Sequence, residues 1–187
     1  MFKFYNVFFT LLMLCVSFKA LSESNKSNKS NKITLNQIES IQNEWAKGLI
    51  NIGAEYEKKG DYRQLALNLI NQLYAFNYGN NIVLFKPTKA STHPFRRTKE
   101  SALSYFVGGN IEEDNGFAIK PWLKIRFSDS KIVISQNTAI SMGNYFFTSV
   151  NDKKNETKVE YTFGYIKDSK GKLRINLHHS SIPHSKN

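Results

Sequence analysis

The sequence predicts an α+β domain in which a curved antiparallel sheet wraps around N-terminal helices. Between Ile38 and Phe76 apolar residues recur every three or four positions, which is the spacing of amphipathic helices. Beyond Pro121 the spacing changes to two, as in half-buried strands, and the connections between these segments are short and polar. Such a sheet closes over the helices as a cone, whose open end is a natural pocket for a small molecule.

Three helices are predicted in the first half of the domain. The apolar stripe of the first consists of Ile38, Ile41, Trp45, Leu49, Ile52 and Tyr56. Thr34 or Asn36 could cap its start, and the two lysines and the glycine at 58–60 end it. Asp61 opens the second helix, whose buried face consists of Leu65, Leu69, Ile70, Leu73 and Phe76. A third, shorter helix is predicted from about Thr98 to Val107, before two glycines.

The predicted strands begin after a turn at 79–81. A short strand is expected at 82–85, and Pro87 stops it. Longer strands are expected near 122–127, 139–150, 158–165 and 173–178, each a hairpin neighbour of the next. In the last of these strands the residues expected to face the helices are Leu173, Ile175 and Leu177.

The first 22 residues have the layout of a secretory signal peptide. Lys3 precedes an apolar run from Val7 to Phe18, and Ala20-Leu21-Ser22 offers a cleavage site. The run is short for a membrane span, although an uncleaved anchor is the alternative. Cys15, the one cysteine, lies inside the run without the small residues of a lipoprotein site. We therefore expect a mature, cysteine-free protein that is exported across the inner membrane to the periplasm and leaves the membrane after cleavage.

Residues 23–32 form a polar three-residue repeat that cannot bury a core, so we expect a flexible tether before a single domain at 33–187. The formal net charge of the whole chain is +11, but the basic residues are scattered. Nucleic-acid binding needs a concentrated basic face, and it is therefore not expected. A general attraction for small anions is the simpler interpretation.

One group of residues that could carry chemistry lies at the end of the last predicted strand. Adjacent strand residues point to opposite faces, so His178 and His179 cannot readily bind one metal ion. If Leu177 faces the helices, His179 and Ser181 share that interior face, and His178 and Ser180 point outward unless a bulge inverts the order. A buried histidine beside a hydroxyl could accept a proton near neutral pH. The alternative is that these groups only satisfy one another at a sheet edge.

A second group combines Thr88, just after the short strand, with Tyr105 in the third helix. Their hydroxyls could donate hydrogen bonds to a small planar oxyanion. The sequence contains no Gly-x-Ser-x-Gly nucleophile elbow, phosphate-binding loop, dinucleotide fingerprint or HExxH motif. These absences argue against a serine hydrolase, a nucleotide-binding enzyme and a zincin.

Several segments occur in an order that resembles the iota class of carbonic anhydrases and, more distantly, the association domain of calcium/calmodulin-dependent protein kinase II. They are Val83–Thr88, Ala102–Gly109, Met142–Tyr145, Thr162–Tyr165 and Leu177–Pro183. The resemblance runs from about Trp45 to Pro183. It implies a cone of the nuclear-transport-factor-2-like fold, usually a homodimer, that interconverts carbon dioxide and bicarbonate. It also implies either a metal-free site or a manganese-dependent one.

In the metal-free form, the resemblance implies that hydroxyls and a histidine hold bicarbonate. The matching positions are Thr88, Tyr105, Ser180 or Ser181, and His178 or His179. Strand alternation favours His179 and Ser181 as the pair inside the cavity. We expect the histidine to take the proton of the attacking water through a hydroxyl, while Thr88 and Tyr105 stabilise charge on the carboxylate oxygens.

A zinc site is not expected, because the mature chain would have no cysteine and its paired histidines diverge. Oxygen ligands for manganese are not excluded. Two other functions would suit the same fold. One is a non-catalytic oligomerisation or small-ligand-binding module, and the other is an isomerase or dehydratase, which would need an aspartate–histidine pair deep in the cone.

Overall fold

The computed structural model describes residues 32–81 and 83–185. The predicted signal peptide at 1–22, and the predicted tether apart from Lys32, lie outside the described residues, as does Ile82 of the predicted short strand. Within the described ranges, no helix is long and apolar enough to cross a membrane.

Three helices form where the apolar spacing predicts them: α2 (Leu35–Glu57), α3 (Tyr62–Leu73) and α4 (Lys99–Val107). Thr34, one of the two predicted caps, begins α2 in a capping box: its hydroxyl accepts a hydrogen bond from the Gln37 backbone N–H, and its own backbone N–H donates to the Gln37 side-chain oxygen. Asp61 and Thr98 cap α3 and α4 in the same way, through side-chain oxygens that accept a backbone N–H.

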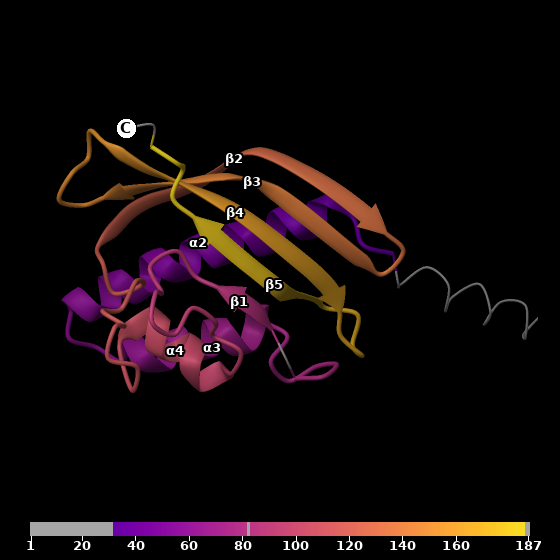
Figure 1. Cartoon of the computed structure of the whole chain (residues 1–187), viewed down its shortest axis with the longest axis horizontal. Helices are drawn as coiled ribbons and strands as arrows, with labels where there is room; N and C mark the ends of the chain where they lie inside the picture. Colours follow the sequence, from indigo (N-terminus) through magenta and orange to yellow (C-terminus); the bar gives the residue numbers. More distant parts are fainter. Residues whose placement is uncertain (1–31, 82, 186–187) are drawn as a thin grey trace, which may run out of the picture. The chain divides into compact units, whose positions relative to one another are not determined.

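The strands form one sheet of order β1-β5-β4-β3-β2. Their bounds are β1 (Leu84–Lys86), β2 (Trp122–Ser135), β3 (Thr138–Ser149), β4 (Glu156–Lys167) and β5 (Leu173–Ser181). The strands from β2 to β5 are antiparallel hairpin neighbours, and the helices lie on one face of the sheet (Figure 1). The sheet is mixed rather than antiparallel throughout, because the short strand β1 pairs parallel to β5. No short turn sets the direction of β1, since most of the domain separates it from β5.

Trp45 of α2 occupies the centre of the core and is fully buried. Its ring contacts six other rings, at centroid distances from 5.4 to 6.4 Å: Phe117, Phe127, Tyr145, Phe147, Phe163 and His178. Aromatic pairs of this kind are worth about 0.5–1.5 kcal/mol each beyond the area they bury. The indole of α2 therefore contacts rings from four strands, β2 to β5.

The alternation of β5 shifts by one residue at Asn176. Gly164 of β4 pairs with Leu177, whereas the next residue, Tyr165, pairs with Ile175, so Asn176 is the extra residue of a bulge. A Cβ atom on Gly164 would lie 2.9 Å from the Asn176 Oδ1 atom and 2.9 Å from the Leu177 Cβ atom, which explains the glycine at this close approach.

Beyond the bulge, His178 and Ser180 are buried, with 3% and 4% of their surface exposed, and His179 and Ser181 lie on the opposite face. The prediction that His179 and Ser181 face the interior is therefore wrong. The inverted order that a bulge would cause is the one observed.

A buried ion cluster fixes the loop that follows β1. The fully buried Arg96 donates to Asp114 at 2.6 Å and to Glu113 at 3.2 Å. Glu113 also accepts the backbone N–H groups of residues 91–93, and these bonds, that of Ser91 foremost, hold the pKa of its carboxyl far below the ordinary range. The backbone just after Thr88 is thereby tied to the loop that precedes β2.

Candidate active site

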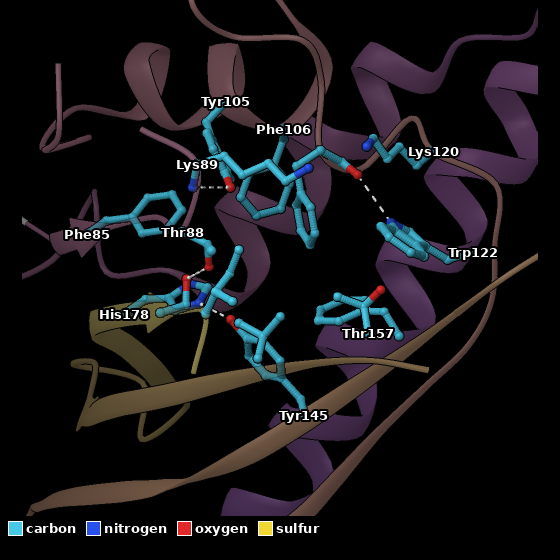
Figure 2. A pocket seen from close by; sticks show the side chains of 15 residues that line it. Phe85, Thr88, Lys89, Tyr105, Phe106, Lys120, Trp122, Tyr145, Thr157 and His178 are labelled. Carbon is cyan, nitrogen blue, oxygen red and sulfur yellow. Dashed lines mark hydrogen bonds between the residues drawn. The ribbon is translucent and has the colours of Figure 1, made fainter. Parts of the chain in front are cut away.

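A cavity of about 170 Å³ opens on the helical face of the sheet, between β5, the loop after β1, and α4. Four of the six residues predicted for the site line it: Thr88, Tyr105, His178 and Ser180 (Figure 2). The other two, His179 and Ser181, line a separate depression on the opposite face, beside Met142. The fold thus brings the two predicted groups together. The histidine and serine at the cavity are His178 and Ser180, not the favoured pair His179 and Ser181.

The parallel pairing of β1 with β5 creates a hydroxyl cluster. Phe85 lies opposite His178 in the register, and Thr88 follows the point where Pro87 ends the ladder. The Thr88 Oγ1 atom donates a hydrogen bond to the Ser180 Oγ atom at 2.8 Å. The next backbone N–H, that of Lys89, donates to the Tyr105 hydroxyl at 3.4 Å. The consecutive residues Thr88 and Lys89 therefore orient the Ser180 hydroxyl of β5 and the Tyr105 hydroxyl of α4.

His178 is packed among aromatic rings. Its imidazole stacks on Phe85 at 4.8 Å and meets the edge of Phe163 at 4.4 Å. Burial, and to a lesser extent the neighbouring His179, lowers the pKa of His178 from the ordinary 6.5 to about 3. The imidazole is therefore neutral at physiological pH, and the expectation that it accepts a proton near neutral pH is not supported.

A directed chain of hydrogen bonds leads from the core to the cavity. The Trp45 indole N–H donates to the Tyr74 hydroxyl at 2.9 Å, and that hydroxyl lies 2.9 Å from the His178 Nδ1 atom. Because indole is only a donor, the Tyr74 O–H is left to donate to Nδ1. The neutral imidazole then carries its hydrogen on Nε2, which faces the Tyr145 hydroxyl at 3.4 Å. The Tyr145 O–H remains available for Ser180 or a ligand.

Sequence reasoning missed Trp45, Tyr74 and Tyr145 as parts of this chain. Tyr145 belongs to a segment that carries the family resemblance, and it could have been found there. Trp45 belongs to the predicted apolar stripe, and nothing local marks Tyr74, so only the folded chain places them beside His178.

The cavity has neutral walls and a positive rim. Burial raises the pKa of Tyr105 to about 12 and that of Tyr145 further, so both phenols stay protonated and act as donors. The charged residues among the described residues that line the cavity are Lys89 and Lys120, and the Lys89 ammonium lowers the pKa of Lys120. An anion therefore meets hydroxyl donors inside and ammonium groups at the rim.

The donor set does not suit a metal ion. Within the part of the chain that the structure describes, no three histidine, cysteine or carboxylate side chains are grouped as ligands. Both ring nitrogens of His178 face tyrosine hydroxyls rather than a carboxylate. Among the described residues no aspartate is hydrogen-bonded to His178, whereas an isomerase or dehydratase of this fold would need such an aspartate–histidine pair.

Comparison with known proteins identifies the family. The model of a family described as metal-independent carbonic anhydrase matches residues 36–182. A metal-independent carbonic anhydrase from Nostoc sp. is 40% identical over 157 residues, which are 81% of this chain and 75% of that protein. The chain belongs to the metal-independent carbonic anhydrases. This membership confirms the predicted resemblance to the iota class, and the family's description agrees with the expectation of no metal cofactor.

Solved structures of similar proteins agree with this family. A cyanobacterial iota-carbonic anhydrase, crystallised with bicarbonate, has 38% identity and a TM-score of 0.79, over 84% of this chain and 96% of that one. A putative calcium/calmodulin-dependent protein kinase II association domain from Xanthomonas campestris has 22% identity and a TM-score of 0.57, over 84% and 97% of the two chains, and shows the shared fold alone. The predicted nuclear-transport-factor-2-like fold of this carbonic anhydrase is confirmed.

The low pKa of His178 predicts a loss of stability in mild acid. Below pH 6.5 the unfolded chain binds a proton at this histidine that the folded chain does not bind, so the free energy of unfolding falls as the pH decreases towards 3. Between pH 7 and pH 5 the expected decrease is about 2 kcal/mol. Urea unfolding at the two pH values measures it.

The matched variants are His178→Gln and His179→Gln. The first should lose most of the difference between pH 7 and pH 5, and the second, on the opposite face, should keep it. An unchanged difference in His178→Gln would contradict the assignment of this pH dependence to the buried imidazole.

Proposed function

We propose that this carbonic anhydrase hydrates carbon dioxide in the cavity at the end of β5, with protein hydroxyls in place of a metal. The observation that carries the proposal is the hydroxyl cluster of Thr88, Ser180 and Tyr105 beside a neutral His178. The reaction is that of its family, the conversion of carbon dioxide and water into bicarbonate and a proton.

In this proposal, Ser180 and Tyr105 donate hydrogen bonds to the bicarbonate oxygens. The Ser180 oxygen already accepts from Thr88, and the Tyr105 oxygen accepts from the Lys89 backbone, which leaves both O–H hydrogens free for a ligand. Because the donors are fixed before the reaction, they stabilise the charge that grows on the two oxygens of carbon dioxide as water attacks the carbon. One donor of this kind typically contributes about 10²–10³-fold to a rate.

The proton of the attacking water leaves towards the solvent in this scheme. Free water has a pKa near 15.7, so its proton must depart while the carbon–oxygen bond forms. The inward route is closed, because Nε2 of His178 already bears a hydrogen and Nδ1 is occupied by Tyr74. We assign His178 a positioning role: its N–H fixes the Tyr145 oxygen, so that the Tyr145 O–H points towards Ser180 and the reacting water.

Metal removal tests the proposed function directly. The purified protein is dialysed against a strong chelator, checked by elemental analysis, and assayed for carbon dioxide hydration by stopped flow. We expect the hydration rate to be unchanged, because the proposed donors are all protein groups. Loss of activity that returns with added manganese or zinc would contradict the metal-free mechanism. A rate equal to that of buffer alone would favour the non-catalytic module.

We further propose that the enzyme is an exported homodimer that works in the periplasm. The signal-like sequence at 1–22 supports export. An exposed apolar strip on the outer face of the sheet, formed by Val133, Ile140 and Met142, supports self-association. Cell fractionation and light scattering are the corresponding measurements.

A further inference from the structure

The cavity is larger than bicarbonate requires. Its volume is about 170 Å³, and an apolar protein cavity of roughly 150 Å³ accommodates a benzene molecule. Bicarbonate has a single carbon and three oxygens, so an anion held by the hydroxyl cluster leaves room for several further carbon atoms.

The hydroxyl cluster and a group of aromatic rings line different parts of the cavity, and they meet where Phe117 stacks on Tyr105 at 5.7 Å. Thr88, Tyr105 and His178 lie on one side of the cavity, and Trp122 lies on the other (Figure 2). Trp122 belongs to an aromatic wall that it forms with Phe117 and Phe147. The ring centroids of this wall are 5.0 Å apart for Trp122 and Phe147, 5.6 Å for Phe117 and Phe147, and 6.0 Å for Phe117 and Trp122.

The aromatic wall offers the cavity no free hydrogen-bonding group. The Trp122 indole N–H donates to the Phe117 backbone oxygen at 3.1 Å, so the polar atom of this ring is used within the protein. Val159 lines the same cavity and is buried. A hydrated anion gains nothing from such a surface, whereas an apolar group loses contact with water there.

We infer that the cavity binds small apolar monocarboxylates such as benzoate, with the carboxylate at Ser180 and Tyr105 and the ring against the aromatic wall. Lys89 and Lys120 at the rim complement the negative charge of such a ligand. The inference rests on the proposed function for the position of the carboxylate. It makes the enzyme open to competitive inhibition by small organic acids.

A ligand series on the full-length wild-type protein tests the inference. Calorimetric titration with formate, benzoate and benzyl alcohol separates the contribution of the charge from that of the ring. Burial of a ring should make benzoate bind about 10- to 100-fold more tightly than formate. Benzyl alcohol, which lacks the charge, should bind at least 10-fold more weakly than benzoate. Benzoate should also compete with bicarbonate in the dehydration assay.

Val159→Phe places a second ring where benzoate would lie, and Leu35→Phe, at the exposed start of α2 and outside the cavity lining, is the control. We expect the first variant to weaken benzoate at least 10-fold without changing formate, and the second to change neither. If Val159→Phe fails to fold, the wild-type ligand series decides.

The outcomes separate the inference from the proposed function. Equal affinities for formate and benzoate in an active enzyme would overturn the inference and leave the proposed function intact. Tight benzoate binding by a protein that does not hydrate carbon dioxide would support the inference and remove the proposed function.

Discussion

Replacement of Ser180 by alanine is expected to lower kcat/KM for carbon dioxide hydration by about 100-fold or more. The side chain is 4% exposed, accepts the Thr88 hydrogen bond and directs its own hydrogen into the cavity in the proposed mechanism. Loss of one preorganised donor to a developing oxyanion typically costs about 10²–10³-fold. Stopped-flow hydration assays of the variant measure the effect.

The next residue provides the control. Ser181 has the same side chain, but it lies on the opposite face, where its hydroxyl donates to Glu160 Oε2 at 3.1 Å. Ser181→Ala should retain activity within about threefold, since a surface substitution of this kind changes stability by roughly 0.5 kcal/mol or less. Equal losses in the two variants, or a larger loss in Ser181→Ala, would refute the assignment of the inner face. Thermal unfolding of both variants excludes a folding defect as the cause.

Thr88→Val is expected to lower kcat/KM by about 100-fold as well, with almost no change in side-chain volume. Valine keeps the shape of threonine but removes the hydroxyl that holds Ser180 at 2.8 Å. Ser180 is then free to rotate, and the cluster loses its fixed geometry. Oriented groups that lose their alignment commonly cost this much in rate. Because the equilibrium constant of the reaction is fixed, kcat/KM for bicarbonate dehydration should fall by the same factor.

Thr157→Val is the matched control, because Thr157 lines the same cavity away from the hydroxyl cluster (Figure 2). It should change kcat/KM by less than about threefold, the range expected when no fixed hydrogen bond to the reacting atoms is lost. Similar losses for the two threonine variants would mean that the polarity of the whole cavity, and not the Thr88–Ser180 hydrogen bond, sets the rate.

The helices and the antiparallel strands could be predicted because their signals are local. The spacing around Trp45 marks the buried face of α2, and the alternation from Val159 to Tyr165 marks β4. The parallel pairing of β1 could not be predicted, since it depends on a contact between segments more than ninety residues apart, such as Phe85 and His178. Periodicity carries no information about such pairings.

The difference between local signals and contacts of distant segments also explains which residues of the site could be predicted. Thr88 and Tyr105 were identified from motifs, and the structure places both at the cavity. The inner members of the histidine and serine pairs were assigned incorrectly, because alternation was carried across Asn176 as if β5 were regular. A bulge depends on how two strands pair, and the regular alternation of residues from Leu173 to Leu177 does not predict one. The hydrogen bond between Tyr74 and His178 could not be predicted either, because it joins residues that are far apart in the sequence.

The bulge at Asn176 also affects how relatives of this enzyme should be aligned. On either side of β5 the chain presents the same two residue types in the same order, imidazole then hydroxyl, two positions apart. An alignment displaced by one position therefore still matches one histidine to a histidine and one serine to a serine, while it pairs inward-facing residues with outward-facing ones. Equivalent residues in distant homologues are best chosen by their partners in β4, such as Phe163 opposite His178. Residue identity alone does not distinguish the inward-facing histidine and serine from the outward-facing ones.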